Sequence, residues 1–270
     1  MDKDIIILFI VEERIIFMYY NLNNEIAKRN TKTVYKDGDK TIKLFIPSYS
    51  KANILNEALN QARVEEGTDL NIPKLVEVTK IENRWALVSE YIEGTPLDIL
   101  MNEHPEKIDE YLELFVDIQL EVLSKQVPLL NRIKDKFRRK LTSATNINEN
   151  IKYELLQRLE GMKNHTKLCH GDFNPSNIII KENGEHYILD WSHVTQGNAS
   201  ADSARTFLLF SMQKKAELAE KYLNLFSKKS GIKKENIQNW IPIVAATQMT
   251  KGIEEEQEFL QRWIDIADYQ

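Results

Sequence analysis

The stretch HGDFNPSN occupies residues 170–177, three isoleucines follow at residues 178–180, and LDW stands at residues 189–191. The isoleucines and the apolar residues before Asp190 favour β-structure, and the polar residues between them are typical of a turn, so we predict a short β-hairpin. Asp172 and Asn177 precede its first strand, and Asp190 follows its second strand. The hairpin therefore brings two carboxylates and one carboxamide to one end.

Phosphoryl transfer from a magnesium–nucleotide complex requires these groups. A carboxylate takes the proton of the attacking hydroxyl group, and oxygen ligands hold the Mg²⁺ ion. The spacing His-x-Asp-x-x-x-x-Asn is that of the catalytic loop of protein kinases, and Asp190 stands where their Asp-Phe-Gly motif begins. We predict that Asp172 is the catalytic base and that Asn177 and Asp190 bind Mg²⁺. His170 is expected to support the loop rather than to react.

Each of these residues also has a purely structural interpretation. Asp172 would then cap the turn after Gly171, Asn177 would be a left-handed turn residue, and Asp190 would cap a strand end. A metal-dependent hydrolase that uses His170, Asp172 and Asp190 is a weaker alternative. Such sites usually need more histidines, and the other four of the five histidines fall in no ligand motif.

Residues 24–91 read as short strands around one helix. Segments 33–36 and 41–45 flank the turn signal DGD at residues 37–39, and segments 75–78 and 85–88 predict a second hairpin. A helix is expected after Ser50. Its predicted buried face consists of Ile54, Leu55, Ala58, Leu59 and Ala62.

Lys43 is the candidate phosphate-binding lysine of this region. It lies between Ile42 and Leu44 on a predicted strand, so its side chain faces opposite its apolar neighbours. Glu57 on the following helix is expected to pair with it and to hold the ammonium group toward the nucleotide phosphates.

Beyond Gly94 the pattern is mostly helical, interrupted by the strands around Ile178 and Ile188. The fold class is therefore α+β, a bilobal protein-kinase-like fold with a small β-sheet plus helix N-lobe and a mainly helical C-lobe. We predict a nucleotide-binding lobe at residues 1–93 and a catalytic and substrate-binding lobe at residues 94–270. Residues 1–20 form an extension, in which the apolar run 4–11 predicts a strand of the N-terminal sheet; alternatively, the natural start lies near Met18.

The ordered motifs resemble the aminoglycoside phosphotransferase and choline kinase-like superfamily. The matching positions are residues 34–35, Lys43, Glu57, residues 90–94, residues 170–172 with Asn177, residues 189–191, and Gly197 through Asp202 to Arg205. The resemblance implies a small-molecule kinase that transfers the γ-phosphoryl group of Mg-ATP or Mg-GTP to a hydroxyl group. It also implies that adenine lies against the backbone around Glu90 and Ile92, and that Asp202 supports the catalytic loop.

The sequence departs from this family in the loop that would cover the nucleotide. Family members often have glycines there, which let backbone amides approach phosphates, but this chain has AKRNT at residues 27–31. Lys28 or Arg29 is expected to supply positive charge instead. The glycine-poor loop also leaves a second hypothesis open, a pseudokinase that acts as a nucleotide- or partner-binding module.

The acceptor is expected to be a small molecule. Protein kinases have an arginine after the loop histidine and a long segment that ends in Ala-Pro-Glu, whereas this chain has Gly171 and a short stretch from Asp190 to Asp202. An acidic cluster near the C-terminus predicts either a rim that attracts an amine-bearing acceptor, such as an aminoglycoside, choline or an amino sugar, or a solvated helix face. The cluster consists of Glu254, Glu255, Glu256 and Glu258.

The composition excludes some other classes of protein. The 270 residues carry a net charge of −5, which gives no overall basic field for nucleic acid. The single cysteine, Cys169, excludes an internal disulfide and a cysteine-rich zinc site, and we predict that it is buried at a strand end. No segment predicts a membrane span or an export signal, so we expect a cytoplasmic protein. The oligomeric state and the choice between ATP and GTP stay open.

Overall fold

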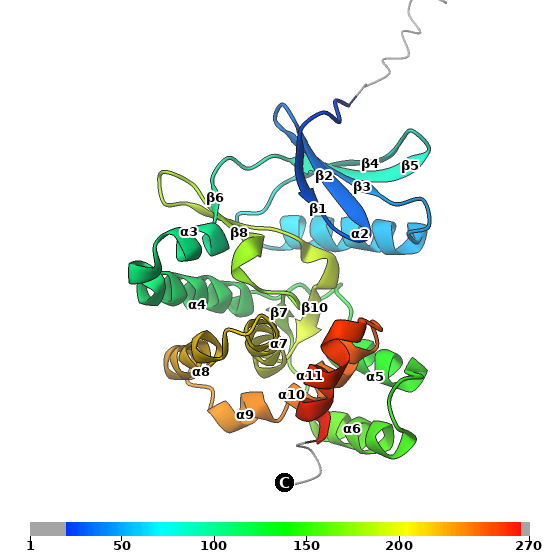
Figure 1. Ribbon diagram of the computed structural model, residues 1–270, viewed down its shortest axis with the longest axis vertical. Coiled ribbons are helices and arrows are strands. Elements are labelled where there is room, and N and C mark those ends of the chain that lie inside the picture. Colours follow the sequence, from blue (N-terminus) through cyan, green and yellow to red (C-terminus); the bar gives the residue numbers. More distant parts are fainter. Residues whose placement is uncertain (1–19, 266–270) are drawn as a thin grey trace, which may run out of the picture.

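The computed structural model describes residues 20–265 (Figure 1). The predicted strand at residues 4–11 and the alternative start at Met18 lie outside the described residues. Within residues 20–265, no helix is both long enough and apolar enough to cross a membrane.

The N-lobe contains an antiparallel five-stranded sheet with the strand order β1-β2-β3-β5-β4. Helix α2 (Lys51–Gly67) packs against this sheet (Figure 1). Both predicted hairpins are confirmed, because their β-forming segments meet in antiparallel register. The strands are β1 (Glu25–Lys28), β2 (Lys32–Asp37), β3 (Lys40–Phe45), β4 (Leu75–Ile81) and β5 (Arg84–Glu90).

The predicted buried face of α2 is partly wrong. Ile54 and Ala58 are buried, but Leu55 and Leu59 are 43% and 48% exposed. The helix instead turns polar residues inward, two of which have partners: Gln61 Nε2 donates to the carbonyl oxygen of Pro73 at 2.7 Å, and Glu57 pairs with Lys43. The burial of polar groups that have partners therefore gives this helix a different orientation from the one that its apolar periodicity predicts.

The C-lobe is mainly helical, as predicted. Its helices are α3 (Leu97–Glu103), α4 (Ile108–Ser124), α5 (Ile133–Ser143), α6 (Glu149–Gly161), α7 (Ala199–Met212), α8 (Ala216–Ser230), α9 (Lys234–Gln238), α10 (Ile241–Met249) and α11 (Glu254–Asp265). Single turns of 3₁₀-helix are η1 (Pro105–Lys107), η2 (Pro175–Asn177) and η3 (Trp191–His193). The short strands are β6 (Thr95–Pro96), β7 (Lys167–Cys169), β8 (Ile178–Ile180), β9 (His186–Ile188) and β10 (Thr195–Gly197).

Two small sheets connect the helical core of the C-lobe to the N-lobe. Strand β8 pairs with β6 and β9, and β10 pairs with β7. Cys169 at the end of β7 is fully buried, which confirms its predicted role. The loops that follow β7 and β9 therefore leave this layer where the two lobes meet.

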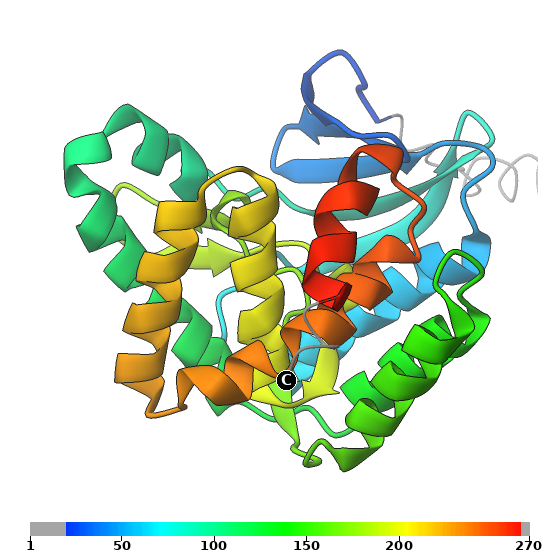
Figure 2. The ribbon, with the colours of Figure 1, turned by 60° about the horizontal axis from the view of Figure 1, so that its bottom comes forward.

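Helix α10 is buried along its whole length and packs against α5, α7 and α11. Figure 2 shows α10 and α11 between the yellow α7 and the green pair α5–α6. This packing sets three helices, α5, α7 and α10, around the loop that follows β7.

Candidate active site

The predicted catalytic hairpin is formed by β8 and β9, which pair in antiparallel register from Ile178 with Ile188. The backbone N–H of Leu189 donates to the carbonyl oxygen of Asn177 at 2.8 Å, so the hairpin closes at this end. Asn177 and Asp190 therefore lie at the same end, as the sequence predicts. Asp190 has a left-handed backbone with φ of 59°, which aspartate adopts more readily than most residues.

Three charged side chains from three separate elements meet at Asp190. Lys43 Nζ on β3 lies 2.8 Å from Glu57 Oε1 on α2 and 3.6 Å from Asp190 Oδ1. Lys32 Nζ on β2 lies 3.2 Å from Asp190 Oδ2 and 3.8 Å from Glu57 Oε1. The predicted pair of Lys43 and Glu57 is present, and the cluster ties the sheet, α2 and the catalytic hairpin together.

The charged groups of this cluster keep one another ionised. Burial opposes ionisation of Asp190, but Lys43 and Lys32 outweigh it and hold the pKa of the carboxyl group well below its usual value. Burial would likewise lower the pKa of Lys43, yet Asp190 and Glu57 raise it above the usual value for lysine. Both groups are therefore fully charged at neutral pH.

Lys32 is a residue that the sequence interpretation missed. Lys28 and Arg29, from which we expected positive charge, are exposed, and their predicted role stays a prediction; Lys32 at the start of β2 is a further cation and reaches Asp190. Register explains the difference: Lys32 pairs with Phe45, two positions from Lys43, so both side chains leave the sheet on the same face. Because successive side chains of a strand point to opposite faces, the position of Lys32 in the β-forming run before the turn could have predicted this placement.

Asp172 lies in the loop after β7 and is held from two sides. Arg205 Nη2 on α7 donates to Asp172 Oδ1 at 3.0 Å, and the Asn177 side-chain amide donates to the Asp172 carbonyl oxygen at 3.0 Å. Burial would raise the pKa of Asp172, but the Arg205 guanidinium beside it lowers it below its usual value. The carboxylate is thus ionised, partly exposed and fixed in direction, which suits a proton acceptor.

His170 and Asp202 hold the backbone of this loop. His170 is fully buried; its Nε2 lies 2.9 Å from the Leu189 carbonyl oxygen, and its ring packs against Trp191. The backbone N–H of Gly171 donates to Asp202 Oδ1 at 2.7 Å. Burial raises the pKa of Asp202. Both residues thus have the supporting contacts that the sequence interpretation assigned to them.

We expect that Gly171→Ala lowers the free energy of unfolding by about 2 kcal/mol more than Gly184→Ala does. Both glycines have positive φ, 79° and 85°, so both substitutions strain the backbone similarly. A Cβ at Gly171 would also lie 2.4 Å from the His193 carbonyl oxygen, whereas nothing lies within 4 Å at Gly184. Urea unfolding of both variants measures the difference, and equal values would contradict the close packing of the catalytic loop.

The donor set at the end of the hairpin fits a magnesium ion. Asp190 Oδ1 is buried without a hydrogen-bond partner, and Asn177 uses its amide nitrogen for Asp172, which leaves its oxygen for another ligand. Mg²⁺ prefers such oxygen ligands and needs few of them from protein, because it keeps waters and phosphate oxygens. Within residues 20–265, no cluster of three or more His, Cys, Asp or Glu side chains is placed to hold a metal ion.

Glu90 and Ile92 lie where β5 leaves the sheet. The backbone N–H of Glu90 donates to Lys74 and that of Tyr91 to Asp39, whereas the N–H of Ile92 forms no hydrogen bond to backbone in the described part of the chain. A free N–H is compatible with the predicted contact to adenine at Ile92. The carboxylate of Glu90 accepts a bond from the Lys74 backbone, so any contact of Glu90 with adenine would come from its backbone.

Comparison with known proteins gives the family. Residues 32–234 match the family model described as "Phosphotransferase enzyme family". The chain belongs to this phosphotransferase family. No curated protein sequence matches the chain significantly.

Solved structures of similar fold include both groups that the sequence resembles. A thermostable mutant of the aminoglycoside phosphotransferase APH(4)-Ia, in its apo form, has a TM-score of 0.67 and 10% identity over 90% of this chain and 92% of that chain. Choline kinase LicA from Streptococcus pneumoniae has a TM-score of 0.61 and 19% identity over 93% of this chain and 91% of that chain. The kinase-like bilobal fold of this phosphotransferase is thereby established.

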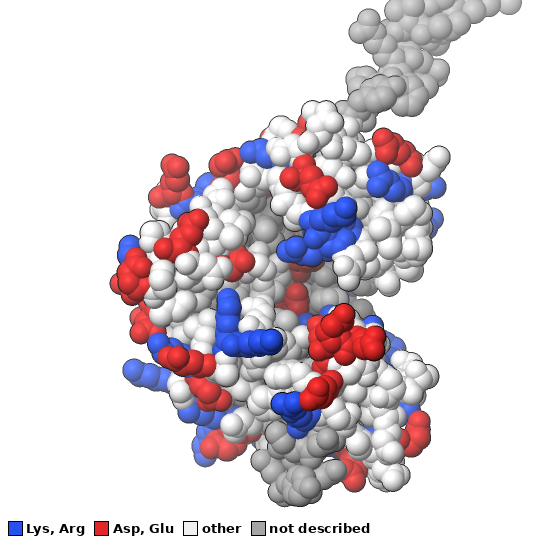
Figure 3. Space-filling model, in the orientation of Figure 1, with Lys and Arg blue, Asp and Glu red and all other residues white. Residues whose placement is uncertain are grey.

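The C-lobe of this phosphotransferase has a strongly basic pocket beside Asp172, between α5, α7 and α10. Burial and neighbouring cations lower the pKa of Lys136 to about 7 and that of Lys140 to about 8. Figure 3 shows the hollow between the lobes, with basic and acidic side chains along its edges. The predicted acidic rim does not line the basic pocket: Glu256 accepts a bond from Gln248 at 2.6 Å, and Glu258 contacts Arg262.

We expect the stability of the phosphotransferase to rise between pH 7 and pH 9, and less so in Lys136→Met. The unfolded lysine has a pKa near 10.5, so in this range the unfolded chain binds a proton that the folded chain does not, which favours folding as pH rises. The groups facing Lys136 are Lys140, Arg205, Lys251 and Asp172. Urea unfolding at both pH values should show a gain larger by on the order of 1 kcal/mol in the parent protein; equal gains would contradict a buried ammonium group.

Proposed function

We propose that this phosphotransferase transfers the γ-phosphoryl group of a magnesium–nucleoside triphosphate, ATP or GTP, to a hydroxyl group of a small molecule. One observation carries the proposal. Asp190, which forms ion pairs with Lys32 and Lys43 of the N-lobe, stands at the same hairpin end as Asn177, whose side-chain amide donates to the backbone carbonyl of Asp172. One contact network thus links the predicted phosphate, metal and acceptor residues.

Asp172 is the proposed catalytic base. The acceptor oxygen attacks the γ-phosphorus and forms the new P–O bond, while the bond from that phosphorus to the β–γ bridging oxygen breaks and the nucleoside diphosphate leaves. Asp172 orients the hydroxyl group early and receives its proton late. Arg205 keeps the carboxylate ionised and fixed.

Asn177 and Asp190 are the proposed magnesium ligands. The metal ion, when bound, neutralises charge on the phosphate oxygens. Lys43 and Lys32 are the proposed phosphate-binding residues. Both ammonium groups face the Asp190 carboxylate and therefore lie next to the proposed metal site. Glu57 holds Lys43 in place, and the backbone around Glu90 and Ile92 is the proposed adenine site.

The similarity to solved structures does not identify the acceptor of this phosphotransferase. An APH(4)-Ia mutant structure is a ternary complex with ADP and hygromycin B, but at 12% identity this likeness concerns the fold. The short stretch from Asp190 to Asp202 favours a small acceptor over a peptide. The division into lobes at residues 93 and 94 and a cytoplasmic location remain predictions.

Thermal shift with Mg-ATP and Mg-GTP, with and without EDTA, tests the nucleotide part of the proposal. A rise in Tm that EDTA removes is the expected result. A screen of hydroxylated metabolites for magnesium-dependent phosphorylation then tests transfer. Nucleotide binding without transfer to any compound would favour the pseudokinase alternative, which the glycine-poor loop at residues 27–31 suggests.

We expect Lys43→Ala to lower kcat/KM for the nucleotide at least about tenfold, because a charged hydrogen bond to phosphate is lost. Lys36→Ala is the matched control, since Lys36 lies on the neighbouring strand but pairs with exposed Glu93. Steady-state kinetics at saturating acceptor measure the change. Full activity in both Lys43→Ala and a double variant with Lys32→Ala would contradict the proposed phosphate contacts.

A further inference from the structure

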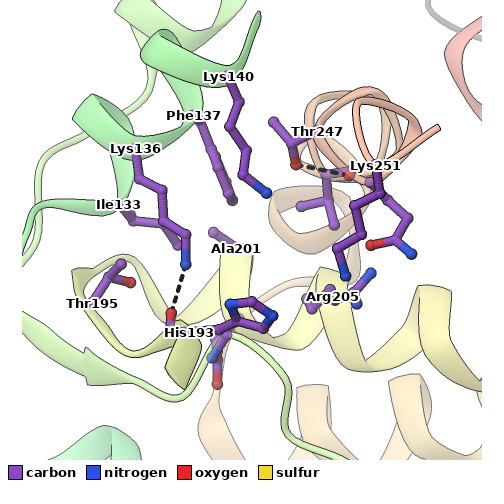
Figure 4. A pocket seen from close by; sticks show the side chains of 14 residues that line it. Ile133, Lys136, Phe137, Lys140, His193, Thr195, Ala201, Arg205, Thr247 and Lys251 are labelled. Atoms are coloured by element: carbon purple, nitrogen blue, oxygen red, sulfur yellow. Dashed lines mark hydrogen bonds between the residues drawn. The ribbon is translucent and has the colours of Figure 1, made fainter. Parts of the chain in front are cut away.

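The basic pocket beside Asp172 is lined by residues of α5, α7 and α10 and of the segments next to them. Lys136 and Lys140 come from one face of α5, Arg205 from α7, and Lys251 from the segment after α10. Figure 4 shows the three lysine side chains pointing into the same hollow as Arg205 and His193. Gly171 and Asp202 form part of its wall, so the hollow reaches the catalytic loop itself.

The positive charge in this pocket is not balanced by the protein. Arg205 pairs with Asp172, and Lys136 Nζ donates to the His193 carbonyl oxygen at 2.7 Å. Lys140 and Lys251 form no ion pair with a carboxylate in the described part of the chain. Among residues 20–265, Asp172 is the one carboxylate that forms an ion pair with a cation of this pocket, and its partner is Arg205.

The other ionisable groups nearby do not change this balance. Asp202 is fully buried behind the loop and accepts the Gly171 N–H, and Glu256, the other carboxylate whose field reaches Lys251, accepts a bond from Gln248. Burial and Lys136 lower the pKa of His193 to about 3, so this ring is neutral. The pocket therefore has an excess of positive charge next to the proposed catalytic base.

A polar group of the pocket also lacks a partner. Thr195 on β10 is buried, and its hydroxyl oxygen has no hydrogen-bond partner within residues 20–265. A buried hydroxyl group without a partner is unfavourable, and lysine ammonium groups without a carboxylate partner attract an anion, so a bound anion would satisfy both. The unpaired hydroxyl group and the unbalanced lysines thus point independently to an anionic ligand.

We propose that the acceptor of this phosphotransferase is an anionic alcohol, a small molecule with a phosphate or carboxylate group in addition to the hydroxyl group that is phosphorylated. Lys136, Lys140 and Lys251 form the subsite for its anionic group, and Asp172 receives the proton of its hydroxyl group. The inference rests on the proposed function and specifies its acceptor class. It replaces the amine-bearing acceptor that the C-terminal glutamates suggested, because an ammonium group in this pocket would face like charges.

Two lysine variants and one matched control test the subsite. Lys140→Gln and Lys251→Gln each remove one pocket charge, and Arg139→Gln removes the same charge from an exposed neighbouring position on α5. Inorganic phosphate serves as the binding probe for the Mg-AMP-PNP complex of each full-length protein, measured by calorimetry. We expect the Kd for phosphate to rise about tenfold in both lysine variants and to stay unchanged in Arg139→Gln.

A set of related acceptors tests the chemical class. Glycerol 3-phosphate, glycerate, glycerol and choline are compared for magnesium-dependent phosphorylation at equal concentration. Higher kcat/KM for the phosphate or the carboxylate compound supports the inference, and the preferred one identifies the anion. The lysine variants should lower kcat/KM for that compound about tenfold, with a smaller change for uncharged glycerol.

The outcomes separate this inference from the kinase proposal. Preferential phosphorylation of choline, or unchanged phosphate binding in both lysine variants, would overturn the anionic subsite and leave the kinase function standing. Loss of phosphate binding in the lysine variants, with no compound phosphorylated, would support the anionic subsite and contradict the kinase function.

Discussion

Replacing Asp172 with Asn lowers kcat by about 10²- to 10⁴-fold and leaves the affinity for Mg-ATP within about threefold of the parent value. The carboxamide has the shape of the carboxylate but cannot take the proton of the acceptor hydroxyl group. Its carbonyl oxygen still accepts the bond from Arg205, which lies 3.0 Å from Asp172 Oδ1, so the loop keeps its position. The measurements are steady-state turnover with the preferred acceptor and calorimetric titration with Mg-ATP.

Asp109→Asn is the matched control, because Asp109 is exposed on α4 and pairs with Lys221. Its turnover should equal that of the parent protein. If Asp172→Asn retained full turnover, Asp172 would have only its alternative role, as a cap of the turn after Gly171.

Replacing Asp190 with Asn weakens magnesium-dependent nucleotide binding by on the order of 100-fold or more. A unit charge at contact distance from a divalent ion in a partly buried site is worth several kcal/mol, and the neutral amide removes that attraction. Asn is the suitable replacement because it also tolerates the left-handed backbone of Asp190, whereas Ala would add backbone strain. Titration with ATP at fixed Mg²⁺ and in EDTA separates the metal-dependent part.

The folded state should survive this change, because Glu57 remains close to both Lys32 and Lys43. Circular dichroism and thermal unfolding without nucleotide check this point. Asp117→Asn, at an exposed pair with Lys229, controls for loss of one negative charge. Unchanged Mg-ATP affinity in a folded Asp190→Asn variant would refute Asp190 as a metal ligand.

The parts of this protein that the sequence predicted well are those set by local patterns. The β-forming runs and turn signals of residues 33–45 and 75–88 gave the two hairpins, and the spacing from Asp172 to Asp190 gave the catalytic hairpin. The family and the bilobal fold were predicted correctly because these motifs occur in order along the chain. The roles of the individual site residues remain predictions, although their contacts agree with them.

The parts that the sequence did not predict depend on tertiary packing. The exposure of Leu55 and Leu59 depends on which polar groups of α2 find partners on the sheet side, and helical periodicity does not contain that information. Lys32 reaches Asp190 only because the strand register and the hairpin bring them together.

The basic pocket is a further case of this kind. Lys136 and Lys140 are four residues apart on α5, which predicts a shared helix face. That Lys251 and Arg205 complete the cluster follows only from the packing of α10 between α5 and α7. The sequence interpretation therefore weighed the exposed glutamates of α11 and overlooked the lysines beside the catalytic loop.

A crystal structure of the complex with Mg-AMP-PNP tests the account most directly. We expect Mg²⁺ at about 2.1 Å from an Asp190 carboxylate oxygen and from the Asn177 side-chain oxygen, with the γ-phosphate facing Asp172. A nucleotide bound with its metal away from Asn177 and Asp190, or with its γ-phosphate turned away from Asp172, would contradict it.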